Sequence, residues 1–230
     1  MNRLIAAFVG LLGICIALPA TAQTAMPSMS APWNWTGFYL GIQGGYGFGQ
    51  ADHIANFGPA ILDVSGTFSA DGGIVGVTGG YNHQFGHIVL GLDTDVSKTW
   101  LSGQTAGIPP AFCPTGGPTA NCKSTLEWLV TARPRLGYAF GQFLPYIDGG
   151  LAVGGVHASG LHGAFSGSET KPGWAAGAGL EVAFSPHFSG KIEYLHIGLA
   201  DQDGIYIVTP TRVSTTFQAD LVRLGINYRF

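Results

Sequence analysis

Charged residues are scarce in this chain. Asp, Glu, Lys and Arg together make up 10% of the 230 residues, whereas hydrophobic residues make up 46%. A soluble domain of average composition carries about 25% charged residues. The composition therefore disfavours an ordinary soluble domain. The small negative net charge of -3 also argues against nucleic acid as a partner.

Long apolar runs are also missing from most of the chain. After Gln23, no stretch approaches the roughly 18 apolar residues that a membrane-spanning helix needs. The one apolar run, Leu4 to Leu18, follows the basic Arg3 and precedes a small-x-small cleavage motif, Ala20-Thr21-Ala22. This pattern predicts a removable signal peptide over residues 1–22, and hence an exported protein.

Cysteine is rare, with three in the whole chain. Cys15 lies in the predicted signal peptide, which leaves Cys113 and Cys122 in the exported part. An even pair in an oxidising compartment predicts a disulfide. A metal site would need His or Cys ligands nearby, and none lies near this pair. No metal or other cofactor is expected.

Glycine is abundant, with 37 residues, and much of the chain alternates apolar and polar residues with a period of two. The last eleven residues show the pattern best. Val222, Leu224, Ile226, Tyr228 and Phe230 fall on one face of a strand, while Arg223, Gly225, Asn227 and Arg229 fall on the other. A half-buried strand of a soluble sandwich and a lipid-facing strand of a membrane barrel share this alternation.

The same alternation recurs in seven earlier segments, which gives eight predicted strands. They span Thr36–Gly49, Gly73–His83, His87–Ser97, Thr125–Tyr138, Leu144–Val156, Gly173–Phe184, Phe188–Gly198 and Asp220–Phe230.

The connections between these segments alternate in length. Short turns are expected near 84–86, 139–143 and 185–187, and long links at 50–72, 99–124, 157–172 and 199–214. Long loops at one end and short turns at the other are typical of outer-membrane barrels. We therefore predict an all-β fold, an eight-stranded antiparallel up-and-down transmembrane β-barrel over residues 36–230. A periplasmic tether over residues 23–35 would precede it.

Several short motifs carry a resemblance to a known family. They are Trp35-Thr36-Gly37-Phe38-Tyr39-Leu40-Gly41, Arg135-Leu136-Gly137-Tyr138, Leu144-Pro145-Tyr146, Glu193-Tyr194-Leu195 and Tyr228-Arg229-Phe230. With them the chain resembles the small eight-stranded outer-membrane barrels of Gram-negative bacteria, of the porin-family or major surface-antigen type. The resemblance implies a location in the outer membrane, surrounded by its lipid. It also implies insertion by the barrel-assembly machinery, with Tyr228 and Phe230 in the assembly signal.

The face opposite the apolar one collects charges of both signs in near balance. An eight-stranded barrel has an interior just wide enough for its own side chains, so these groups are interpreted first as ion pairs that fill the lumen. A narrow, water-filled conduit for ions is the alternative. The predicted lumen network comprises Asp93, Asp95, Glu127, Arg133, Arg135, Asp148, Glu181, Lys191, Glu193, Arg223 and Arg229.

Other chemistry has weaker support in the sequence. Paired acids in a hydrolase need a cleft, which a filled lumen lacks. Lipid A deacylase barrels carry a His-x-Ser-Asn run, but His196-Ile197-Gly198-Leu199 lacks its Ser and Asn. No catalytic residue is assigned, and the protein is not expected to be an enzyme. His53, His157 and His162 fall in predicted outer loops and could bind haem iron or a metal.

These observations predict a surface-display or structural barrel of the outer membrane with a lumen largely filled by side chains. A small porin-like passive channel is the first alternative. A haemin- or host-binding surface protein that acts through its outer loops is the second.

Overall fold

The computed structural model describes residues 33–57, 64–105, 122–160, 165–199, 205–208 and 211–230. In this part of the chain, no helix is long and apolar enough to cross a membrane. Nine strands form one antiparallel sheet. They are β1 (Gly37–Phe57), β2 (Val64–Phe85), β3 (Ile88–Thr105), β4 (Cys122–Tyr138), β5 (Phe143–Gly160), β6 (Phe165–Ala183), β7 (Phe188–Leu199), β8 (Ile205–Val208) and β9 (Thr211–Arg229).

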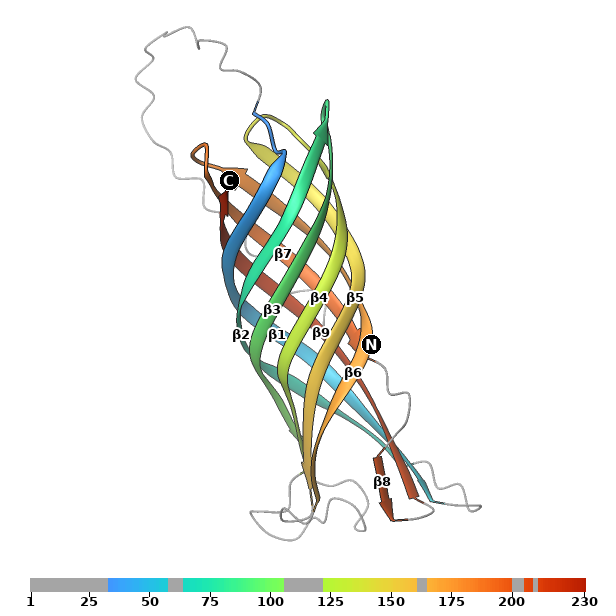
Figure 1. The fold of residues 1–230 in the computed structure, drawn as a ribbon. Coiled ribbons are helices and arrows are strands. Elements are labelled where there is room, and N and C mark those ends of the chain that lie inside the picture. Colours follow the sequence, from blue (N-terminus) through green and yellow to red (C-terminus); the bar gives the residue numbers. More distant parts are fainter. Residues whose placement is uncertain (1–32, 58–63, 106–121, 161–164, 200–204, 209–210) are drawn as a thin grey trace, which may run out of the picture. The chain divides into compact units, whose positions relative to one another are not determined.

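Eight of these strands close into a barrel (Figure 1). Neighbours in sequence are neighbours in the sheet from β1 to β7, β7 pairs with β9, and β9 pairs back to β1. This closure leaves no open edge, which is the condition for a sheet to stand in hydrocarbon. The predicted eight-stranded antiparallel barrel is confirmed. The short β8 was not predicted, and it pairs only with the outer end of β9.

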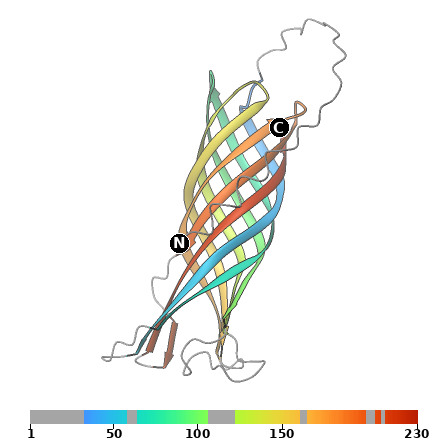
Figure 2. The ribbon, with the colours of Figure 1, turned by 180° about the vertical axis from the view of Figure 1, so that it is seen from behind.

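The strands are longer than the sequence pattern indicated. β1 and β2 comprise 21 and 22 residues, and their pairing continues from Gly37 opposite Asn82 to Ala55 opposite Val64. Much of the predicted long links is therefore strand. The alternation stops near Phe48 because the apolar belt ends there, whereas the backbone ladder continues beyond the belt. Figure 2 shows these extensions, which converge at the end opposite the short turns.

The two faces of the wall follow the predicted period of two. On β9, Leu224 is 63% exposed and faces outward, while its neighbour Arg223 is 0% exposed and faces the lumen. Pro134 also faces outward, and the pairing of β4 with β5 skips from Ala132 to Arg135 beside it. Proline lacks the N–H that a ladder needs, so this gap accommodates it.

One register irregularity corrects the prediction for β4. The register shifts between Leu126 and Trp128 on the β5 side, and between Lys98 and Leu101 on the β3 side. The shift turns Leu126 inward, where it is fully buried, although the alternation had placed it outward. It also leaves Glu127 half-buried at the irregularity rather than inside the lumen.

The lumen is filled in three layers along the barrel. At the end with the short turns, a small apolar cluster consists of Trp35, Val89, Ala139, Leu144 and Ala183, with Trp33 packed against it. The middle layer is charged. The third layer, toward the outer end, is apolar and includes Leu101, Leu126, Leu129, Leu195, Ile197, Leu199, Phe217 and Leu221. The expectation of a polar lumen therefore applies only to the middle layer.

Glycines in the wall allow the apolar layer to pack tightly. A Cβ on Gly154 would lie 2.6 Å from Leu199 Cδ1 and 2.9 Å from Leu126 Cδ1. A Cβ on Gly47 would meet Leu221 Cδ2 at 2.5 Å. Inward leucines thus lie over the bare backbone of glycines on neighbouring or nearby strands of the wall. The outer part of the lumen is packed with side chains, like a protein core.

Candidate functional site: the buried charge network

The middle layer gathers nine charged side chains from six strands. The acids are Asp93 and Asp95 on β3, Asp148 on β5, Glu181 on β6 and Glu193 on β7; the cations are Arg133 and Arg135 on β4, Lys191 on β7 and Arg223 on β9. All nine are at most 8% exposed. Their inward positions follow from residue spacing, because alternate residues of a strand point to the same face.

Direct cross-strand pairing brings opposite charges together. Asp93 is the register partner of Arg133, and Glu193 is the register partner of Arg223. Glu181 likewise lies opposite Lys191. Directly opposed side chains on one face lie about 4.5–5.5 Å apart at Cβ, so opposite charges there attract.

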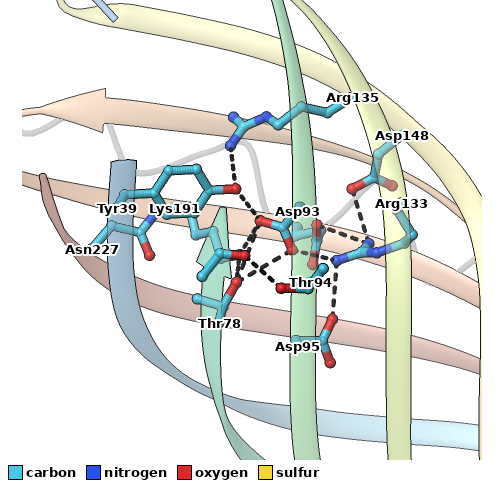
Figure 3. Close-up of polar contacts among 12 residues, drawn as sticks. Tyr39, Thr78, Asp93, Thr94, Asp95, Arg133, Arg135, Asp148, Lys191 and Asn227 are labelled. Atoms are coloured by element: carbon cyan, nitrogen blue, oxygen red, sulfur yellow. Dashed lines mark hydrogen bonds and ion pairs between the residues drawn. The ribbon is translucent and has the colours of Figure 1, made fainter. Parts of the chain in front are cut away.

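Arg133 lies at the centre of the network (Figure 3). Its Nη2 is 3.1 Å from Asp93 Oδ1 and 3.1 Å from Asp95 Oδ2. Its Nη1 is 2.9 Å from Asp148 Oδ2 and 3.2 Å from Glu193 Oε1. One guanidinium thus joins four carboxylates from three strands. The planar fork of arginine suits this role, whereas lysine would offer a point charge.

Arg223 contacts two of the carboxylates that Arg133 also contacts. Its Nε donates to Glu193 Oε2 at 2.9 Å, its Nη2 contacts the same oxygen, and its Nη1 donates to Asp95 Oδ1 at 3.1 Å. Asp93 has further partners besides Arg133. Tyr39 donates its phenolic hydrogen to Asp93 Oδ2 at 2.6 Å, and Lys191 Nζ lies 3.6 Å from that oxygen.

Arg135 forms a second centre nearer the short turns. Its Nη2 lies 2.8 Å from Glu181 Oε2, and its guanidinium carbon lies 4.0 Å from the centroid of the Tyr146 ring. Ser189 and Asn227 donate to the other oxygen of Glu181 at 2.5 and 2.9 Å. The adjacency of β3 and β4 predicts Asp93 and Asp95 as partners of both arginines, but Arg135 pairs with Glu181, two strands away from β4.

The network holds five carboxylates and four cations, so it carries one more acid than base. Asp148 is the least satisfied member. It contacts Arg133 at 2.9 Å, yet neither of its oxygens is in hydrogen-bond geometry with a partner. Among the described residues, Asp148 contacts a single cation, Arg133, whereas Asp93, Asp95 and Glu193 each contact a second cation.

Two members of the predicted network lie elsewhere. Glu127 sits at the irregularity of β4, as described above. Arg229 is half-buried at the mouth beside the short turns, where its guanidinium carbon lies 4.8 Å from the Trp33 ring and 5.4 Å from the Trp35 ring. It donates to the carbonyl oxygen of Pro186 at 3.0 Å, and in the described part of the chain it forms no ion pair with a carboxylate.

Sequence reasoning missed the uncharged members. Tyr39, Tyr146, Thr78 and Thr131 all donate to network carboxylates. The period of two predicts that Tyr39 and Tyr146 face inward, but it assigns them no role. The signal was available, because a hydroxyl one strand away from an inward acid is a natural hydrogen-bond donor.

The remaining predicted sites are only partly described. Among the described residues, no group of three or more His, Cys, Asp or Glu is arranged to hold a metal ion. His53 and His157 lie in β1 and β5 rather than in loops. His162 and Cys113 lie outside the described residues, and only the backbone of Cys122 is described, at the start of β4. The disulfide stays a prediction.

The buried network can stabilise and close, but it offers no surface for catalysis. Its acids contact cations or hydroxyls inside the lumen, between two apolar layers. Charges removed from water need such partners, because an unpaired buried ion is costly. The geometry supports a buried layer of paired charges with one acid in excess.

Comparison with known proteins agrees with this architecture. Residues 11–230 match the family described as outer membrane protein beta-barrel domain. The chain is 34% identical to the 31 kDa outer-membrane immunogenic protein of Brucella melitensis, over 91% of this chain and 89% of that protein. It is 27% identical to the 25 kDa outer-membrane immunogenic protein of Brucella canis, over 93% and 91%.

Among solved structures, the chain is similar to Neisserial surface protein A, with a TM-score of 0.47, 16% identity, and coverage of 85% of this chain and 98% of that one. The family match covers nearly the whole chain. The sequence identity to the 31 kDa relative is above 30%. The protein is located in the outer membrane, and the chain belongs to the outer membrane protein beta-barrel domain family.

Proposed function

We propose that this protein is a structural and surface-display barrel of the outer membrane, and that its lumen does not conduct. The observation that carries the proposal is the filling of the lumen. Trp35, Arg133 and Leu126 represent its three layers, and they are 1%, 0% and 0% exposed. A conduit would need water along the whole axis, and two of the three layers are apolar.

The display part of the proposal rests on the length of the strands. β1 and β2 continue for several residues beyond Phe48, where the apolar belt ends, so the paired strands themselves extend beyond the membrane. Two relatives are named outer-membrane immunogenic proteins, which fits a protein whose outer part is accessible to antibodies. We extend this accessibility to the present chain.

A small passive channel is the first alternative. It would require the apolar layer around Leu126 and Leu199 to open. Binding of haemin or a host surface is the second alternative, and it depends on outer connections that lie outside the described residues. We also propose that Tyr228 and Phe230, which are exposed on the outward face, serve the barrel-assembly machinery as a recognition signal.

Closure can be tested by potassium release from vesicles that contain the folded protein. We expect release no faster than from protein-free vesicles, with gramicidin as the control that the vesicles can release potassium. Faster release that scales with the amount of folded protein would favour the channel.

Display can be tested by inserting a short epitope between β3 and β4, within 106–121. An insertion at Gly141, in the turn between β4 and β5, is the matched control. Antibody should label intact cells only for the first insertion. Equal labelling of both, or labelling of the second alone, would contradict the proposed orientation.

A further inference from the structure

The barrel end with the short turns carries a belt of outward aromatic side chains with histidines among them. Outer-membrane barrels have short turns on the periplasmic side, so this belt lies where the wall meets the headgroups of the inner leaflet. The outward aromatics here are Phe38, Tyr81, Phe85, Tyr138, Phe140, Phe143, Phe184, Phe188, Tyr228 and Phe230.

Three exposed histidines lie in this belt, and each contacts an aromatic ring. The His87 ring stacks on Tyr138 at 5.4 Å between centroids and 11° between planes. The His187 ring stacks on Tyr228 at 5.7 Å and 15°. The centroid of the His83 ring lies 4.4 Å from the centroid of the Phe85 ring. The three come from β2, the turn after it, and the turn before β7.

Among the described outward side chains of this belt, the three histidines are the ones that can carry a positive charge. Among the described side chains, no Asp, Glu, Lys or Arg faces outward at this end. Arg229 is directed toward Trp33 and Trp35. The outward acids Asp71 and Asp220 lie near the other boundary of the apolar region, beside Phe48 in the register.

We propose that His83, His87 and His187, which lie at separate positions around this end of the barrel, each bind phosphate groups of anionic phospholipids in the inner leaflet. Phosphate oxygens accept hydrogen bonds from imidazole N–H groups, and a cationic ring also attracts their negative charge. The surrounding tyrosines and phenylalanines lie at the boundary between the headgroups and the acyl chains, as the aromatic girdles of outer-membrane barrels do.

The geometry of His87 links binding to protonation. His87 Nδ1 lies 3.2 Å from the carbonyl oxygen of Ala139, which can only accept, so Nδ1 carries a hydrogen. In the neutral ring, Nε2 then has no hydrogen to donate to a phosphate. A phosphate at Nε2 therefore needs the imidazolium, the form that histidine takes up in mildly acid solution.

Aromatic rings are the described neighbours of the three histidines. The titratable groups that face them are Tyr81 on β2, Tyr138 on β4 and Tyr228 on β9. Arg229 lies beside His187, because its Nη2 donates to the carbonyl oxygen of Pro186 and its backbone N–H donates to the carbonyl oxygen of His187. No carboxylate of the described residues contacts any of the three rings.

The test measures phosphatidylglycerol retained by the folded, detergent-purified protein, using native mass spectrometry at about pH 6 and about pH 8. Wild type should retain more lipid at the lower pH, by roughly fivefold for each ring that becomes protonated. Phosphatidylcholine, which has no net charge, should show no such change.

Three variants separate charge from structure. Replacing all three rings (His83→Gln, His87→Gln, His187→Gln) should abolish the pH dependence, and replacing all three with Lys should give high retention at both pH values. His196→Gln is the matched control, because His196 also faces outward but lies at the outer boundary beside Asp220. It should behave as wild type.

If the triple Gln variant does not fold, His87→Gln alone should remove about one fivefold step. The proposal is overturned if wild-type retention is the same at both pH values. It is also overturned if the Gln variants keep the wild-type pH dependence, or if phosphatidylcholine shows the same dependence.

Discussion

Replacing Arg133 should reveal how much the charge network contributes to stability. In Arg133→Met, Asp93, Asp95 and Glu193 each keep a contact with Lys191 or Arg223, whereas Asp148 loses its one described cation. Removing one member of a buried ion pair costs about 3–5 kcal/mol, because the other member is left as an uncompensated buried charge. We therefore expect Arg133→Met to lower the free energy of unfolding by about that amount.

Removing the charge of Asp148, the acid that has lost its cation, should restore much of the lost free energy of unfolding. Asp148→Asn alone changes five acids and four cations to four of each, so its cost should stay within about 1 kcal/mol. The double variant should be at least about 2 kcal/mol more stable than the sum of the two single effects predicts. Outward Leu136→Met on the same strand is the control and should change stability by less than about 0.5 kcal/mol.

The assay is urea unfolding of the barrel in lipid vesicles, followed by tryptophan fluorescence. Simple additivity of the two single variants would refute the reasoning, because it would mean that Arg133 and Asp148 do not interact. A cost below about 1 kcal/mol for Arg133→Met would refute it as well, because water would then be solvating the acids.

Three further outcomes are expected. A lysine at outward Leu224 should cost roughly 2–4 kcal/mol in vesicle unfolding, whereas Arg223→Lys should be milder; equal tolerance would mean that the faces are exchanged. Deletion of Phe230 should leave the chain periplasmic and unable to migrate as a folded barrel on an unheated gel, and normal folded abundance would refute its role as a signal. Cys113 and Cys122 should form one disulfide, so reduction should raise the intact mass by two hydrogens; the closed loop of about ten residues implies somewhat under 3 kcal/mol of local stabilisation. Two freely alkylated thiols in unreduced protein would exclude the bridge.

The sequence was sufficient for the parts of the fold in which the two faces differ in polarity. On β9, aliphatic residues such as Leu224 alternate with polar ones such as Arg223, so the outward face and the strand could both be predicted. Asp93 and Arg133 could both be placed on inward faces of strands that follow one another in the chain, but their exact opposition could not, because the long connection between β3 and β4 leaves the register open.

The sequence was insufficient where the contrast between faces disappears. On β7, inward Leu195, Ile197 and Leu199 alternate with the outward polar His196 and with Gly198, so the usual polar-inside contrast is reversed or absent and the apolar layer was not foreseen. The inward turn of Leu126 depends on a register shift that only cross-strand pairing reveals. The contact of Arg135 with Glu181 bridges strands that are not neighbours, and the alternation of single strands says nothing about such contacts.

The central claim is that the lumen is closed, and single-channel recording of the purified wild-type protein in a planar lipid bilayer tests it most directly. The packed layers predict no discrete current steps at neutral pH, even after insertion has been verified by the folded-barrel migration of protein recovered from the membrane. Reproducible open-channel steps that appear only when folded protein is present would contradict the claim.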